Sequence, residues 1–202
     1  MRSRKKLEET IGETRRVEIA HVLLKVIAEH GFDKASLRLV AREAGCTTGV
    51  LSHHFLSKEN LVCHAVTVMF DWLDEQLLRA KQESNRLEAL QIAVGLSLKA
   101  QPMPADFWAV WLQVLSRAKQ SRSLLQIINE RNSRWCRALA ELVTEGQARG
   151  EIRNDADPSL LADFIDAVSV GLGFMAPIEP KRLSKKRKEE LAKFLVSILR
   201  PQ

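Results

Sequence analysis

Apolar side chains recur along this chain with the spacing of amphipathic helices, and no segment shows the strict alternation of a half-buried strand. In the segment Thr14–His30, Ile19, Leu23, Val26 and Ile27 fall on one side of a helix. Glycines, prolines and short polar residues divide the rest into similar segments. The pattern predicts an all-α protein of about nine helices. The expected helices span residues 14–30, 37–44, 48–54, 58–82, 86–98, 107–119, 121–145 and 158–175, with a last one after the polar linker 177–188.

Capping residues stand at the expected ends of the first helices. Gly31 suits the left-handed residue that ends a helix, and Ser36 is a good N-cap for the short helix that follows. Gly45 then breaks the chain, and either Thr47 or Thr48 can cap the next short helix. Two short helices that are joined by a glycine turn and packed under a longer helix are typical of a helix-turn-helix.

The composition, 46% apolar and 28% charged, is that of an ordinary soluble globular protein. No apolar run approaches the ~18 residues that span a bilayer, and the charged N-terminus has no apolar stretch behind it, so neither a membrane span nor a signal peptide is expected. Three unevenly spaced cysteines form no disulfide framework, which indicates a reducing cytoplasm. A formal charge of +6 favours an anionic partner. The basic run 181–188 is interpreted as a solvated linker rather than a DNA contact.

The segment SLRLVAREAGCTTGVLSHHFLSKENL resembles the N-terminal module of TetR-type transcriptional regulators. The matching steps are Ala44-Gly45, Gly49-Val50-Leu51, His54-Phe55 and Ser57-Lys58-Glu59, while Ser52-His53 replaces two tyrosines that are common there. The resemblance implies a DNA-binding helix-turn-helix domain with a basic N-terminal arm over residues 1–60. It also implies a helical ligand-binding and dimerisation domain over residues 61–202.

The resemblance further implies which side chains meet DNA. Residues of the third helix would face the major groove, and residues at its flanks would meet phosphates. The N-terminal arm would follow the backbone or enter the minor groove. The expected DNA-binding set is Ser36, Arg38, Thr47, Thr48, Gly49, Ser52, His53, His54, Lys58, Arg4 and Lys5.

Simpler interpretations of the same residues stay open. The N-terminal basic residues are also compatible with a solvated tail, His54 with packing near Phe55, and Cys46 with core filling rather than redox sensing. A zinc site at His53 and His54 is not expected, because neighbours on a helix point about 100° apart and no other ligand has suitable spacing.

Aromatic and acidic residues in the second half are arranged like parts of a cation cage. Phe107, Trp108 and Trp111 share one helix, and Asp163 and Asp166 share another. Aromatic faces with a carboxylate can hold a quaternary ammonium ion through cation–π attraction and charge. The alternative is that the tryptophans are ordinary core and that an aspartate pairs with an arginine.

The order of these pieces, with LSHHF and Ile165-Asp166, resembles the choline-responsive repressors within the TetR-type family. The resemblance implies an effector site built from Trp72, Phe107, Trp108, Trp111 and Asp166.

The sequence thus predicts a homodimeric regulator without enzymatic activity, cofactor or metal. A small-molecule effector, choline-like or another cation, would release this repressor from a palindromic double-stranded DNA operator. Ser169, Gly171 and Gly173 give the eighth helix a small-residue face, which favours a dimer interface of the eighth and ninth helices. One alternative is a helical scaffold that binds DNA without sequence preference. The other is a small helical enzyme that uses Asp163 and Asp166, against which the scattered histidines weigh.

Overall fold

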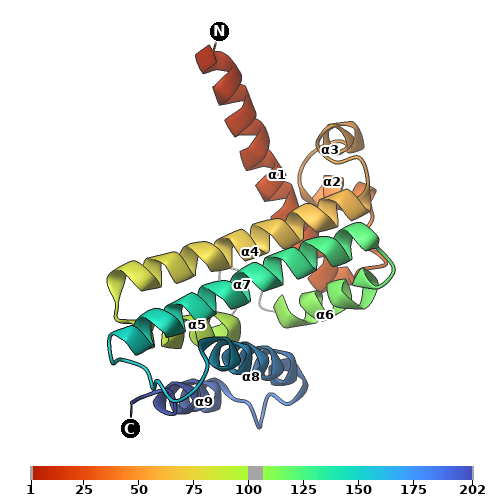
Figure 1. Ribbon diagram of the computed structural model, residues 1–202. Coiled ribbons are helices and arrows are strands. Elements are labelled where there is room, and N and C mark those ends of the chain that lie inside the picture. Colours follow the sequence, from red (N-terminus) through yellow and green to blue (C-terminus); the bar gives the residue numbers. More distant parts are fainter. Residues whose placement is uncertain (1, 100–106, 202) are drawn as a thin grey trace. The chain divides into compact units, whose positions relative to one another are not determined.

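The computed structural model describes the backbone of residues 2–99 and 107–201 and the side chains of residues 12–96 and 107–201. Within these ranges the chain forms nine helices and no strand, which confirms the all-α prediction (Figure 1). The helices are α1 (Arg2–His30), α2 (Leu37–Glu43), α3 (Thr48–His54), α4 (Lys58–Glu83), α5 (Arg86–Lys99), α6 (Phe107–Ala118), α7 (Arg122–Ala148), α8 (Pro158–Ile178) and α9 (Lys185–Ser197).

Local hydrogen bonds explain why the first helices begin and end where they do. Gly31 ends α1 with φ +84°, and Gly45 takes φ +62° in the turn between α2 and α3. The Ser36 hydroxyl accepts the Leu39 amide at 3.2 Å and caps α2. Thr47, rather than Thr48, caps α3 by accepting the Val50 amide at 3.2 Å. The predicted turn chemistry is therefore present.

Two helix starts differ from the prediction. The helix α1 begins at Arg2, well before Thr14, so the predicted basic arm is part of this helix. The helix α9 begins at Lys185, inside the stretch interpreted as a linker. The reason is a second serine cap, because the Ser184 hydroxyl accepts the Arg187 amide at 3.3 Å.

The expectation that no apolar run approaches membrane-spanning length is wrong for α8. Among the described residues, Pro158–Met175 is long and apolar enough to cross a membrane, with mean hydropathy 1.4 over 18 residues. Length and composition alone do not separate such a segment from a packing helix of a soluble protein. Only 22% of this segment is buried within the chain, so α8 keeps an exposed apolar face.

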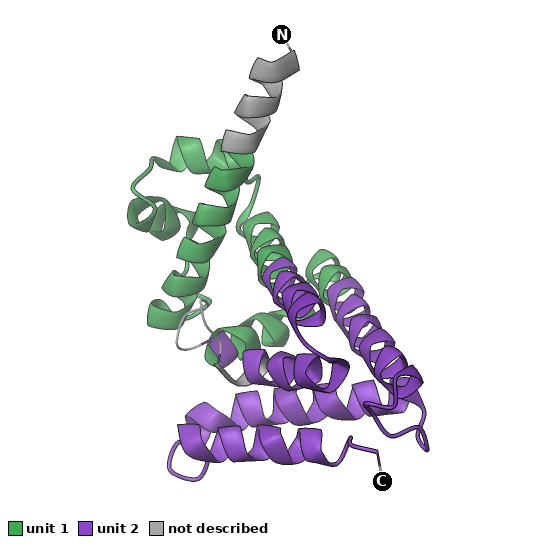
Figure 2. Ribbon diagram, turned by 90° about the vertical axis from the view of Figure 1, so that its left-hand side faces the viewer, with its two compact units in different colours: residues 1–69, 109–128 green, residues 70–108, 129–202 purple. Residues whose placement is uncertain are grey.

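The chain divides into two compact units, which Figure 2 shows in different colours. Unit 1 contains residues 1–69 and 109–128, and unit 2 contains residues 70–108 and 129–202. In unit 1, α2 packs against both α1 and α3. Its core includes Leu23 of α1, Leu51 of α3 and the adjoining Phe55, each at most 1% exposed.

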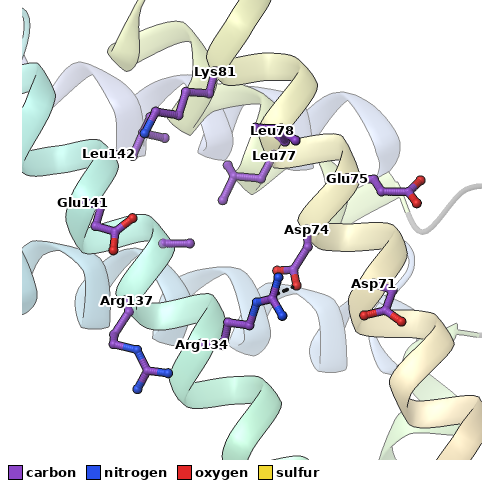
Figure 3. A pocket seen from close by; sticks show the side chains of 11 residues that line it. Asp71, Asp74, Glu75, Leu77, Leu78, Lys81, Arg134, Arg137, Glu141 and Leu142 are labelled. Atoms are coloured by element: carbon purple, nitrogen blue, oxygen red, sulfur yellow. Dashed lines mark ion pairs between the residues drawn. The ribbon is translucent and has the colours of Figure 1, made fainter.

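Unit 2 contains α5 packed against α8 and α9. Within this unit, the later part of α4 is tied to α7 by three ion pairs. Asp71 pairs with Arg131 at 2.6 Å, Asp74 with Arg134 at 3.1 Å, and Lys81 with Glu145. The pairs follow the same order along both helices, so these parts of α4 and α7 run in the same direction. Between them lies a groove of about 620 Å³, which the Asp74–Arg134 pair crosses (Figure 3).

Candidate DNA-binding surface and effector site

The helix α3 presents its short polar residues outward. Thr48, Gly49, Ser52 and His53 are exposed, whereas Leu51 of the same helix is fully buried. This division follows the helical period and leaves the hydroxyls and one imidazole on the outer side. Such groups can donate to or accept from base edges and phosphates.

A concave surface lies beside α3 and extends along α2. This cavity, about 570 Å³ in volume, is lined by Ser36, Arg38 and Thr48 of the predicted set, and also by Arg42 and Cys46. Arg42 was not predicted, although it lies one helical turn after Arg38 and is exposed. Two guanidinium groups and several hydroxyls along one hollow suit an anionic backbone.

His54 lies on the inner flank of the same helix. Burial, and then the positive charge of neighbouring His53 and Arg16, lower the pKa of the His54 imidazole. Its carbonyl oxygen accepts a hydrogen bond from Arg16 Nη1 at 2.9 Å, and the Arg16 guanidinium stacks 4.7 Å from the centre of the Phe55 ring. Packing beside Phe55, the simpler interpretation of His54, is therefore what the structure contains, with the two rings 6.5 Å apart.

Sequence reasoning missed the bracing role of two arginines of α1. Arg15 Nη2 donates to the Ala44 carbonyl at 2.8 Å, and Arg16 makes the bond to His54 described above. Together they tie α1 to the ends of α2 and α3. The consecutive arginines at the start of the predicted helix were a visible signal, but their targets are backbone atoms that no side-chain pattern reveals.

Lys58 of α4 is half-buried and contacts Phe32, which follows α1. Its ammonium group donates to the carbonyl oxygen of Phe32 and lies 4.3 Å from the centre of the Phe32 ring. Burial lowers the pKa of the Lys58 amine. The structure therefore does not bring Lys58 to the outer surface of α3, which weighs against the predicted phosphate contact. The side chains of Arg4 and Lys5 lie outside the described residues.

No group of three or more His, Cys, Asp or Glu side chains able to hold a metal ion occurs in the part of the chain whose side chains are described. His53 and His54 contact each other edge to face, with ring centres 5.4 Å apart.

The predicted effector residues of unit 2 do not form one cluster, because the aromatic residues and Asp166 have different contact partners. Phe107 and Trp108 contact each other with ring centres 5.1 Å apart, and Trp108 also meets Phe174 of α8 at 5.0 Å. The indole lies so close to Gly173 that a Cβ there would come within 1.9 Å of it. This contact with Trp108 explains why position 173 of α8 is glycine, independently of the predicted dimer interface.

Asp166 stands two turns before Gly173 on α8 and contacts a different tryptophan. Trp135 of α7, which is not among the predicted effector residues, donates from its indole nitrogen to the Asp166 carboxylate at 3.1 Å. Burial raises the pKa of Asp166, while the Trp135 bond lowers it in part. The same surroundings raise the pKa of the nearby Cys136 thiol to about 11, mainly through burial.

The two remaining effector candidates, Trp72 and Trp111, are half-buried. Trp111 belongs to unit 1, whereas Trp72, Phe107, Trp108 and Asp166 belong to unit 2.

Comparison with known proteins identifies the family. A family model described as "BetI-type transcriptional repressor, C-terminal" matches residues 86–200, and one described as "Bacterial regulatory proteins, tetR family" matches residues 19–65. The chain belongs to the TetR family of transcriptional regulators. The predicted family resemblance is confirmed, and the enzyme alternative built on Asp163 and Asp166 is set aside, because the TetR relatives are regulators.

Relatives within the TetR family match nearly the whole chain. The repressor KstR2 of Mycolicibacterium smegmatis is 26% identical over 192 residues, which cover 94% of this chain and 93% of the relative. The regulator PksA of Bacillus subtilis is 24% identical over 177 residues, covering 87% and 84%.

Two solved structures share the fold. A TetR-family regulator from Rhodococcus has a TM-score of 0.78 at 20% identity, over 92% of this chain and 98% of that one. A transcriptional regulator from Saccharomonospora viridis in complex with choline has a TM-score of 0.79 at 24% identity, over 92% and 96%. TetR-family regulators bind DNA and small-molecule effectors, usually as dimers.

Proposed function

We propose that this TetR-family protein is a dimeric repressor that binds a palindromic operator through α2 and α3 and is released by a small organic cation. The observation that carries the DNA-binding part is the outer side of α3. Thr48, Gly49, Ser52 and His53 are exposed there, beside a hollow that Arg38 and Arg42 line. Residues 1–60 would then form the DNA-binding domain, and residues 61–202 would bind the effector and the second protomer.

Exposed apolar side chains on α8 and α9 support the dimer. Large apolar side chains that are usually buried project from both helices, and such patches on a soluble protein commonly mark a protein interface. They are Leu160 (64% exposed), Phe164 (44%), Ile178 (66%), Phe194 (65%) and Ile198 (37%). A two-fold dimer would present two recognition helices about 34–36 Å apart, one turn of DNA, and hence read an inverted repeat.

Asp166 is the residue that supports a cationic effector. Its carboxylate is half-buried and held by the Trp135 indole rather than by an arginine, so its charge stays available to a ligand. Phe174 lies on the same helix, α8, and its ring contacts Trp108 of α6. A carboxylate near aromatic rings suits a quaternary ammonium group, and the Saccharomonospora regulator of the same fold binds choline.

Selection from a pool of random duplexes tests the DNA-binding part. The expected product is an inverted repeat with half-sites about one helical turn apart. Uniform recovery of all sequences with a steep salt dependence would instead support the non-specific scaffold.

Calorimetry with choline and with its uncharged carbon analogue 3,3-dimethylbutanol tests the effector part. Choline is expected to bind and to release the operator, whereas the neutral analogue is expected to do neither. Equal binding of both compounds would contradict the role of Asp166.

A further inference from the structure

The positive charge of this protein is concentrated most strongly in one short segment near its C-terminal end. The chain contains 31 Lys or Arg and 25 Asp or Glu residues, and residues 181–188 contain six of the basic residues and no acidic one. The other 25 basic residues are balanced by the 25 acidic ones. The whole net charge of +6 is therefore equal to the charge of this segment, here named the basic cluster: Lys181, Arg182, Lys185, Lys186, Arg187 and Lys188.

The basic cluster is ordered by the fold of unit 2. Leu183, in the middle of it, is only 4% exposed and anchors the connection between α8 and α9. Ser184 caps α9, so Lys185 to Lys188 occupy the first turn of that helix. Lys185, Lys186 and Lys188 therefore lie on a helix, and Lys181 lies in the turn just before it, whereas the sequence predicted an irregular linker for this stretch.

Three lysines of the cluster have no acidic partner. Arg182 pairs with Glu179, and Arg187 with Glu190 at 3.3 Å. Lys181, Lys185 and Lys186 are exposed and form no ion pair among the described residues. Positive charges in the first turn also oppose the helix dipole, which favours anions there. An anion bound at the cluster would relieve both the mutual repulsion and this unfavourable placement.

We propose that the basic cluster is a second DNA-contacting surface, which binds the phosphodiester backbone of duplex DNA without reading its sequence. Lysines, a serine hydroxyl and backbone amides of a first turn are groups that commonly contact phosphates. This contact is additional to operator reading by α3.

The lack of exposed apolar and aromatic side chains within residues 181–188 favours duplex DNA over a membrane or single-stranded nucleic acid as the partner. Insertion into an anionic bilayer needs exposed apolar side chains next to the charges, and binding of single strands needs aromatic rings for stacking. Leu183 is the one apolar side chain within 181–188, and it is buried. The segment itself therefore offers charge alone, which matches a continuous line of phosphates, and the exposed Ile178 and Phe194 beside it belong to the proposed dimer interface.

The test compares two triple variants of the full-length protein on a random-sequence duplex. Lys181→Gln/Lys185→Gln/Lys186→Gln removes the unpaired lysines and leaves the Arg182 and Arg187 pairs in place. Arg137→Gln/Arg149→Gln/Lys193→Gln removes the same charge from exposed positions of unit 2 outside the cluster. Affinity is measured from about 50 to 200 mM salt, the range over which phosphate contacts lose strength.

In the cluster variant, the plot of log affinity against log salt is expected to become less steep by about 2 to 3, because each lost phosphate contact contributes ~0.9 to the steepness. The control variant is expected to keep the slope within about 1 of the unchanged protein. The arginine variant Lys181→Arg/Lys185→Arg/Lys186→Arg keeps the positive charges and should keep the full steepness. This result would show that the glutamine variant loses phosphate contacts through its lost charge and not through misfolding. Equal losses in both glutamine variants, or no loss in either, would overturn the proposal.

Two further measurements distinguish a sequence-independent DNA contact from operator reading and from membrane binding. The ratio of operator affinity to random-duplex affinity should be the same in the cluster variant and the unchanged protein, because only a sequence-independent contact is lost. A fall in this ratio would place the cluster in operator reading and contradict the proposal. Binding to phosphatidylserine vesicles that depends on the cluster, without any change in DNA binding, would show a membrane contact instead.

Discussion

The indole nitrogen of Trp135 on α7 donates a hydrogen bond to the carboxylate of Asp166 on α8 across 3.1 Å. A half-buried carboxylate needs such a donor, because burial without a partner disfavours its charged form. The bond also fixes the direction in which the carboxylate points. Trp135 therefore positions the negative charge to which we assign the effector.

Replacing Trp135 by phenylalanine should weaken effector binding while preserving most of the packing. We expect choline affinity to fall roughly tenfold, since a lost hydrogen bond to a charged group corresponds to about 1.5–3 kcal/mol. Calorimetry on Trp135→Phe, Asp166→Asn and the double variant measures this. If Trp135 acts through Asp166, the double variant should be no weaker than Asp166→Asn. Fully additive losses would indicate that Trp135 acts independently.

Acidification should weaken effector binding through the same carboxylate. The pKa of Asp166 is raised above its ordinary 3.8, chiefly by burial. The carboxylate becomes protonated as the pH falls through this raised pKa, so attraction for a cation is lost in that range. Choline titrations over descending pH should show the loss, and Asp166→Asn should show none. A pH dependence that persists in Asp166→Asn would assign it to another group.

The local features of the DNA-binding segment follow from the sequence because they depend on neighbours in the chain. A serine or threonine cap needs only an amide three residues on, and the left-handed glycines need only a turn. Ser36, Gly31 and Gly45 could be placed on this basis, and the cap of α3 could be narrowed to Thr47 or Thr48.

Contacts between helices depend on their register, which a single sequence does not contain. Trp135 and Asp166 are 31 positions apart, and nothing in either segment specifies which tryptophan meets which aspartate. The same holds for Lys58, whose motif position indicated a phosphate contact and gave no sign of the contact between its ammonium group and Phe32, 26 positions earlier. The start of α9 was missed for a different reason, since a dense run of charges concealed the Ser184 cap.

Gly49 offers a way to separate DNA contact from folding. It lies inside α3, and a Cβ there would meet only the Thr47 hydroxyl at 3.7 Å, an ordinary contact. Gly49→Ala should therefore stabilise the protein by about 0.5–1 kcal/mol, as alanine does within a helix. If the outer side of α3 approaches DNA closely, the added methyl group should still lower operator affinity.

Thermal unfolding and operator titration of Gly49→Ala measure the two effects. Gly95→Ala is the matched control, because Gly95 lies inside α5 and an added Cβ there has nothing within 4 Å. This control should gain similar stability and keep its operator affinity. Unchanged operator affinity in Gly49→Ala would contradict a close approach of α3 to DNA at this residue.

Glu145 should be a principal stabilising charge of unit 2. It binds Lys81 through one oxygen and Arg86 Nε through the other at 2.6 Å, and the Arg86 side chain is only 9% exposed. Glu145→Gln would leave this buried guanidinium without its counter-charge, so we expect a loss of about 2 kcal/mol in the free energy of unfolding. Glu141→Gln, one turn earlier on the exposed side of α7, should cost less than about 0.5 kcal/mol.

The contribution of Glu145 should also depend on pH in a defined direction. The hydrogen bonds from Lys81 and then Arg86 hold the pKa of Glu145 below its ordinary 4.5. A carboxylate with a lowered pKa in the folded state stabilises the fold above the unfolded value, and this stabilisation is lost as the pH falls through the folded one. Denaturant titrations at neutral and acidic pH should show the stability of the unchanged protein approaching that of Glu145→Gln as the pH drops below 4.5. If the difference in the free energy of unfolding between the unchanged protein and Glu145→Gln stays constant with pH, Glu145 acts through its shape rather than its charge.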